Sequence, residues 1–170
     1  MKILYRTIAG SRLYGLEHAD SDWDWYTVVD RVQKKKASYH SHSIVDGLDS
    51  TVVDFGTWMV DCQTGVPQAL EAMFSTKPDV DELAHLRAGF KAGTKYDVYL
   101  GIMKRMALTP KWDDYKHKRH LVRLGMNLRD LREFGRFNPT LSTVEKNLVN
   151  ELAKLPMEYV YNDALAIARA

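Results

Sequence analysis

The spacing of apolar residues changes along the chain, from a period of two in the first third to a period of three and four after about residue 57. Residues 3–9 alternate apolar and polar side chains, and residues 23–29 and 51–55 are rich in aromatic and β-branched residues, which predicts three strands. The connection between the last two predicts either a hairpin tip with a long excursion carrying Lys34–Lys36 or an additional short strand. Strands followed by helices predict an α+β fold, with a small mixed β-sheet, helices packed behind it and a helical C-terminal half.

Glycines, prolines and capping residues divide the remainder of the chain into helices. Two short helices are predicted on either side of Gly65, and a third begins near Thr94 as its N-cap. A long helix is predicted over residues 114–134, with a buried leucine stripe and with Gly125 at a close contact between helices. Ser142 begins a capping-box pattern, which predicts the start of a further helix.

Length and composition limit the class of protein. One domain is expected for 170 residues, with residues 1–110 as its core and residues 111–170 as the helical part of the same compact unit. A net charge of +2 points to no particular partner, so nucleic-acid binding would need a local basic patch. No signal peptide or bilayer-spanning run is visible, and the single cysteine, Cys62, is expected to be a buried structural thiol. These features predict a cytoplasmic protein.

A Gly-Ser pair followed about ten residues later by two aspartates is the most informative segment. Asp22 and Asp24 are two apart on a predicted strand, so both carboxylates point to one face. Such a pair repels itself unless a cation lies there, and hard oxygen ligands suit Mg²⁺ completed by waters and substrate phosphates. Gly10 allows backbone amides to approach an anion, and Ser11 adds a hydroxyl donor. The segment therefore predicts a site for a metal ion and phosphate.

Simpler interpretations of the same residues exist. Asp-x-Asp pairs also cap turns, and Gly-Ser pairs are common in loops. A calcium loop beginning at Asp20 is excluded, because Trp25 stands where that loop needs glycine and Arg31 where it needs glutamate.

The Gly-Ser pair and the Asp-x-Asp pair together resemble the signature of the DNA polymerase β-like nucleotidyltransferase superfamily, in which Gly-Ser is followed by apolar-Asp-apolar-Asp-apolar. Trp23 and Trp25 fill apolar positions of that pattern. The longer string, Gly10-Ser11-Arg12-Leu13-Tyr14-Gly15 and then Asp20-Ser21-Asp22-Trp23-Asp24, is most similar to the subgroup of RNA-repair-pathway nucleotidyltransferases, also met in bacteriophages. The resemblance spans roughly residues 3–140.

The superfamily pattern includes a third carboxylate on a neighbouring strand. Asp54 is the matching candidate and Asp49 the runner-up. The subgroup then has a helix, a Gly/Asn-Pro break and an apolar-Glu-apolar helix, and residues 65–67 and 70–73 are similar to that pattern, with Val66 in place of asparagine.

Residues 115–124 resemble the basic helix of the subgroup, and residues 111–136 hold eight Lys and Arg against four Asp and Glu. Lys116, His120 and Arg123 are spaced by four and three, so they share one side of the helix and are expected to face the carboxylates across a nucleotide-sized cleft. The alternative is a solvated charged face, as it is for the lysine run at 34–36. A zinc site at His117 and His120 is disfavoured because no further ligands have suitable spacing.

The resemblance implies an Mg²⁺-dependent nucleotidyltransferase, with Mn²⁺ as an alternative ion, that uses a nucleoside triphosphate such as ATP. The implied acceptor is an RNA end, tRNA-like included, or a protein hydroxyl as in toxin-like members, and a homodimer is a possible assembly. A nucleotide- or RNA-binding module without turnover is the alternative of another class. Tyr14 and the two tryptophans are candidates for stacking on a base, although we expect the tryptophans to be core. The implied roles are catalysis and metal binding by Asp22, Asp24 and Asp54, and nucleotide binding by Gly10, Ser11, Arg12, Tyr14, Lys116, Lys118, His120 and Arg123.

Overall fold

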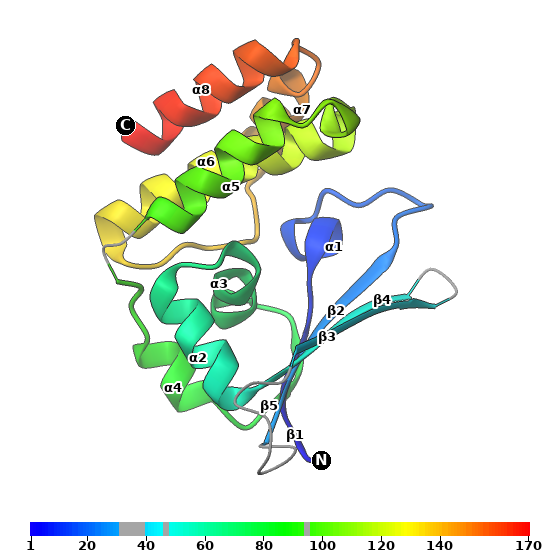
Figure 1. Ribbon diagram of the computed structural model, residues 1–170, viewed down its shortest axis with the longest axis vertical. Helices are drawn as coiled ribbons and strands as arrows, with labels where there is room; N and C mark the ends of the chain where they lie inside the picture. The colour runs from blue at the N-terminus through cyan, green and yellow to red at the C-terminus, as the bar shows by residue number, and fades with distance from the viewer. Residues whose placement is uncertain (31–39, 46–47, 94–95) are drawn as a thin grey trace. The chain divides into compact units, whose positions relative to one another are not determined.

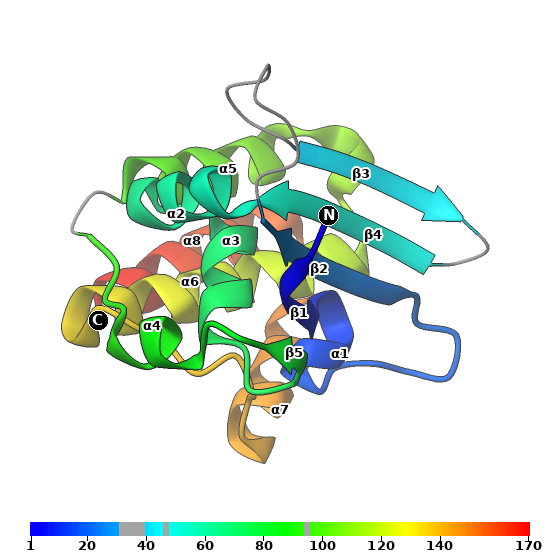
Figure 2. The same ribbon diagram turned by 90° about the horizontal axis from the view of Figure 1, so that it is seen from below.

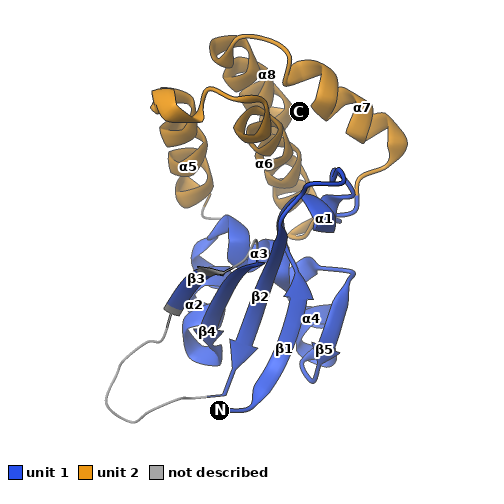
Figure 3. Cartoon of the chain, turned by 90° about the vertical axis from the view of Figure 1, so that its right-hand side faces the viewer, with its two compact units in different colours: residues 1–90, 138–140 blue, residues 91–137, 141–170 orange. Residues whose placement is uncertain are grey.

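The computed structural model describes residues 1–30, 40–45, 48–93 and 96–170 and divides the chain into two units (Figures 1 and 3). The first unit is residues 1–90 with 138–140, and the second is residues 91–137 with 141–170. The division falls after Phe90, whereas the sequence suggested residue 110, so the helix before residue 110 groups with the C-terminal helices.

The first unit is built on a mixed five-stranded sheet in the order β3-β4-β2-β1-β5 (Figure 2). Its strands are β1 (Ile3–Ile8), β2 (Trp23–Val29), β3 (His40–Val45), β4 (Leu48–Asp54) and β5 (Pro78–Asp81). All neighbours run antiparallel except β2 and β4, which are parallel. The α+β prediction is confirmed, and the additional strand between the second and third predicted strands is β3. A direct hairpin of β2 with β4 is wrong, because a parallel pair needs a crossover connection.

Four helices belong to the first unit: α1 (Gly10–Tyr14), α2 (Phe55–Thr64), α3 (Pro67–Phe74) and α4 (Ala84–Gly89). The break at Gly65 is confirmed, since this residue ends α2 with a left-handed φ of 82° and Pro67 begins α3. Pattern analysis missed α1, α4 and β5, which are all six residues or shorter. Elements this short carry too few turns or alternations to show a period.

The two faces of the sheet have different surroundings. Tyr5 of β1 stacks on Trp58 of α2, with ring centroids 5.6 Å apart, and its hydroxyl donates to the carbonyl of Ala72 in α3 at 2.6 Å. Tyr26 pairs with Thr7 across β1 and β2, so its side chain points to this same covered face. By alternation Asp24 belongs to the covered face, whereas Trp23 and Trp25 belong to the other. No described helix of the first unit covers that other face (Figure 3).

The second unit is helical, with α5 (Asp97–Leu108), the short 3₁₀ helix η1 (Pro110–Trp112), α6 (Tyr115–Phe134), α7 (Thr143–Leu152) and α8 (Met157–Arg169). The leucine stripe of α6 is buried as predicted. At Gly125 a methyl group would overlap the carbonyl oxygen of Ala164 in α8, which confirms the close helix contact. The capping box of α7 is also present, with Ser142 and Glu145 each bonded to the backbone of the other.

Some predicted features are found at other residues, and others concern residues that are not described. Thr94 and Lys34–Lys36 are not described, and α5 has Tyr96 as its N-cap. Leu100 of α5 is 40% exposed. Cys62 is fully buried, its thiol donates to the carbonyl of Ala69, and burial followed by the charge of nearby Asp61 raises the pKa of the thiol. Cys62 is therefore held as an inert thiol. Among the described residues, no helix has the length and apolar character that crossing a bilayer requires.

Candidate functional site

The two halves of the motif meet where β1 ends and β2 begins. The amide of Ala9 donates to the carbonyl of Asp24 at 2.8 Å, and the next residue, Gly10, turns the chain into α1 with a φ of +61°. A methyl group at Gly10 would overlap Oδ2 of Asp24 and lie 2.9 Å from its Cγ. Only glycine lets the Asp24 carboxylate pack against the turn, because the positive φ and the close approach both exclude a side chain.

Arg12 of α1 holds the segment that enters β2. Its Nε donates to the carbonyl of Asp22 at 3.1 Å, and its Nη2 donates to the carbonyl of Ser21 at 2.7 Å. The guanidinium also lies over the ring of Trp23, 4.1 Å from the centroid. Arg12 was predicted to bind nucleotide, but here it fixes the backbone beside Asp22 relative to the Gly-Ser turn.

Tyr14 is fully buried, and its hydroxyl donates to Oε1 of Glu71 in α3 at 2.8 Å. A ring without exposed surface cannot stack on a nucleobase, so the expectation that Tyr14 contacts nucleotide needs correction. The Tyr14–Glu71 pair instead anchors α1, and thereby Ser11, to the helical layer. Glu71 matched the apolar-Glu-apolar pattern in the sequence, but its partner could be found only from the fold.

The position of the third carboxylate is decided by the register of β2 and β4. Asp24 pairs with Asp49, whereas Asp54 pairs with Val29 at the far end. Asp54 is five residues beyond Asp49, about 16 Å at 3.3 Å per residue, and its odd offset turns it to the opposite face. There it caps α2, accepting from the amide of Thr57 at 3.0 Å and from the Thr57 hydroxyl at 2.5 Å.

The prediction that Asp54 shares a metal ion with Asp22 and Asp24 is therefore wrong. An antiparallel hairpin would bring the end of β4 beside the start of β2, but the parallel pairing brings the start of β4 there instead. The runner-up, Asp49, lies beside Asp24 on the same face, and its Oδ1 is 2.6 Å from Nε2 of His42.

The donor set at this end of the sheet suits a hard cation. Asp22 is exposed, Asp24 and Asp49 are half-buried, and all three offer carboxylate oxygens. Within the described ranges, no three His, Cys, Asp or Glu side chains are grouped closely enough to enclose a metal ion. That arrangement fits Mg²⁺, which is usually held by one or two carboxylates, waters and substrate phosphates rather than by an all-protein cage.

The predicted phosphate-binding residues of α6 belong to the second unit. Lys116 is exposed, while Lys118 forms an ion pair with Asp113 at 2.7 Å. Arg123 is only 5% exposed, which argues against the alternative of a solvated charged face at this residue, and reversal of its charge would destabilise the fold. Burial, and then the charge of Arg123, lowers the pKa of His120 well below its usual value. His120 is therefore neutral near pH 7 and would contact a phosphate by a hydrogen bond, not as a cation. Whether these side chains face the aspartates stays a prediction.

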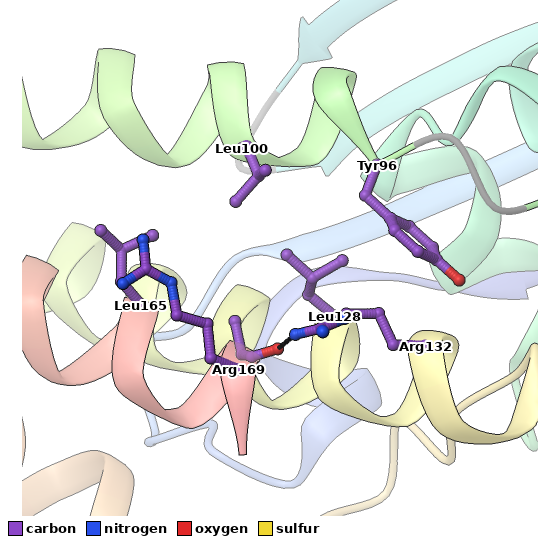
Figure 4. Close-up of a pocket in the computed structure, with 7 residues that line it drawn as sticks. Tyr96, Leu100, Leu128, Arg132, Leu165 and Arg169 are labelled. Atoms are coloured by element: carbon purple, nitrogen blue, oxygen red, sulfur yellow. Dashed lines mark hydrogen bonds between the residues drawn. The ribbon is translucent and has the colours of Figure 1, made fainter.

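A separate pocket of about 260 Å³ lies within the second unit (Figure 4). It has apolar walls from α5, α6 and α8 and two arginines, of which Arg132 donates to the carbonyl of Ala168 at 2.6 Å. Its lining residues are Tyr96, Leu100, Leu128, Arg132, Leu165, Ala168 and Arg169. None of the sequence-predicted site residues lines it, so it is distinct from the motif site.

Comparison with known proteins identifies the family of the chain. The Gly-Ser turn packed against an Asp-x-Asp strand defines a polymerase β-type nucleotidyltransferase protein. Residues 1–160 match the family model RlaP, the RNA repair pathway DNA polymerase beta family, and the chain belongs to that family. Among solved structures, a nucleotidyltransferase-like protein from Exiguobacterium sibiricum 255-15 is similar, with a TM-score of 0.36 and 13% identity over 99% of this chain and 68% of that one. No curated protein matches the chain in sequence.

Proposed function

We propose that the chain transfers a nucleoside monophosphate from a nucleoside triphosphate to an acceptor hydroxyl and releases pyrophosphate. The acceptor oxygen forms a bond to the α-phosphorus, and the bond from that phosphorus to the bridging oxygen breaks. The acceptor is an RNA end, a choice supported by membership of a family described by RNA repair.

The observation that carries the proposal is the contact between Gly10 and the Asp24 carboxylate. This contact brings a backbone turn that can bind phosphate next to a carboxylate that can bind a cation, in a position that only glycine permits. A structural turn has no need of an aspartate at this contact, because an alanine or serine in β2 would pack there without burying part of a charge.

Each residue of this site has its own role in the proposed reaction. Ser11 and the amides of the turn would donate to the β- and γ-phosphates, while Asp22 and Asp24 would hold Mg²⁺ beside the triphosphate. When bound, the ion neutralises phosphate charge and lowers the pKa of the acceptor hydroxyl. Asp49, the carboxylate in register with Asp24, would take the proton of that hydroxyl. Arg12 and Glu71 act by position, since they hold the β2 entry and α1 respectively.

A turnover assay with each triphosphate labelled at the α-phosphate tests the proposal. Wild-type protein, Mg²⁺ and an RNA oligonucleotide should give a labelled RNA and pyrophosphate, and Asp24→Asn should remove both. Ser11→Ala should weaken triphosphate binding about ten- to a hundred-fold, because one charge-assisted hydrogen bond is lost. A matched control is Ser142→Ala, which removes a serine hydroxyl of α7 in the second unit. Binding of triphosphate without product for any acceptor would support the non-catalytic module instead, and label on a protein would identify the toxin-like reaction.

A further inference from the structure

Four side chains form a continuous stack beside the motif, on the face of the sheet that no described helix of the first unit covers; Figure 3 shows the sheet and these helices. We name it the Arg-Trp ladder, and its members in order are Arg12, Trp23, Trp25 and Arg6. The guanidinium of Arg12 lies 4.1 Å from the ring centroid of Trp23. The two indoles stack with centroids 6.3 Å apart and planes at 12°, and Arg6 lies 5.2 Å from the centroid of Trp25.

The ladder is not core, which corrects the expectation from the sequence. Trp23 is 45% exposed, whereas Trp58 on the covered face has no exposed surface. The outer arginine is held in place, since Arg6 makes hydrogen bonds from Nε and Nη2 to the carboxylate of Asp79 at 2.9 and 2.5 Å. Arg12 is held by the two carbonyls described above. Because its members are already held in place, a planar ligand that adds to an end of the ladder costs little side-chain entropy.

We propose that the Arg-Trp ladder binds unpaired bases of single-stranded RNA next to the transfer site. Indole and guanidinium planes are the groups on which splayed RNA bases stack, and stacking tolerates any sequence because every base has a π-face. Arg12 adds a positive charge that suits the RNA backbone. The choice of RNA as occupant rests on the proposed function, whereas the stacking surface rests on the ladder alone.

The position of the ladder suits an acceptor strand. Trp23 lies between Asp22 and Asp24 in the chain, with its side chain on the opposite face at the first residue of β2. An RNA strand with a base stacked on the ladder needs only to pass the end of β2 to bring its terminal hydroxyl to the carboxylates of Asp22 and Asp24. The ladder would therefore hold the acceptor next to the carboxylates.

The experiment measures binding of a short fluorescent single-stranded RNA to the full chain by anisotropy, without triphosphate. Trp23→Ala should weaken binding about tenfold or more, while Trp23→Phe, which keeps a ring, should retain most of it. Tyr159→Ala, a 60% exposed aromatic residue of α8 in the second unit, is the matched control and should bind as wild type does. An abasic oligonucleotide of equal length carries the same charge without bases, so it should bind weakly and be insensitive to Trp23→Ala. Quenching of tryptophan fluorescence by RNA should be smaller in Trp23→Phe, a readout that remains if Trp23→Ala fails to fold.

Several outcomes would overturn the proposal. Equal binding of RNA by wild type and a folded Trp23→Ala, or equal binding of the RNA and its abasic form, would mean that the ladder only holds β1, β2 and α1 together. Tighter binding of single-stranded DNA or of duplex RNA would reject single-stranded RNA as the occupant. Transfer is measured in parallel at saturating RNA: binding that depends on Trp23 in a wild type without turnover would refute the proposed function and leave the ladder standing.

Discussion

The two ends of the β2–β4 pair carry one aspartate each on β4, and these aspartates have different surroundings. At the first end, Asp49 lies beside Asp24 next to the Gly10 turn. At the far end, Asp54 lies beside Val29 and caps α2. Each aspartate directly follows an apolar residue of β4, so the local sequence does not distinguish the two. Their surroundings differ because the strand register gives them different neighbours in β2. The parallel pairing therefore places Asp49 beside the motif and Asp54 at the cap of α2.

The sharpest test of this difference compares amides at two positions. Asp24→Asn should lower nucleotide transfer about a hundredfold or more, because a neutral amide is a poor ligand for Mg²⁺ and does not offset its charge. Asp54→Asn should leave transfer near the wild-type rate, since asparagine is also a good N-cap. Steady-state rates with labelled triphosphate measure both. If Asp54→Asn were the more damaging change, the register argument would fail.

A second comparison uses glycines at the two ends. Gly10→Ala should destabilise the fold by about 2–3 kcal/mol, because the methyl group meets the Asp24 carboxylate in a left-handed conformation. Gly56→Ala in α2 meets only Oδ1 of Asp54, at 3.2 Å, and alanine favours helix, so its stability should change by less than about 1 kcal/mol. Urea unfolding monitored by circular dichroism measures both. Similar losses in the two variants would show that the Gly10 turn has room for a side chain.

Asp49→Asn should have an intermediate effect on transfer. Loss of a general base costs at least about a hundredfold when it is the only route for the proton, but water can also take the proton of the acceptor hydroxyl, so we expect about tenfold. The loss should be smaller at high pH, where the acceptor hydroxyl ionises more readily, and a pH–rate profile measures this. A loss that is the same at every pH would show that Asp49 holds structure through His42 instead.

The smallest expected effect is at the helix cap. Asp54→Ala removes the acceptor for the Thr57 amide and hydroxyl and should cost about 1 kcal/mol, or about 2–4 °C in Tm for a chain of this size. Transfer per folded molecule should not change. Thr57→Val, which removes only the hydroxyl contact, should cost less than Asp54→Ala, and the reverse order would argue against the cap.

The sequence was sufficient for the parts of the fold that local patterns determine. Period and capping residues located the long helices, and Gly10, Asp22 and Asp24 were recognised because the motif is contiguous and its chemistry is local. Pairing direction has no local signature, since residues 51–55 alternate in the same way in a parallel or an antiparallel partner. Asp54 was preferred to Asp49 on the superfamily pattern, and no local signature of pairing direction was there to correct that choice. The burial of Tyr14 and Arg123 was missed because it depends on packing between elements distant in sequence.

The strand order has a consequence for synthesis on the ribosome. β1 is made well before β5, but its second edge pairs with β5, whose Asp81 lies opposite Tyr5. Until residue 81 has emerged, one edge of β1 has unpaired backbone donors and acceptors, which can pair with a strand of another chain. Folding of the sheet must also wait for this contact, since pairings between distant residues are slow to form. We therefore expect the growing chain to be most prone to aggregation between completion of β4 and arrival of β5, and a ribosome stalled in that interval to hold the protein in its most chaperone-dependent form.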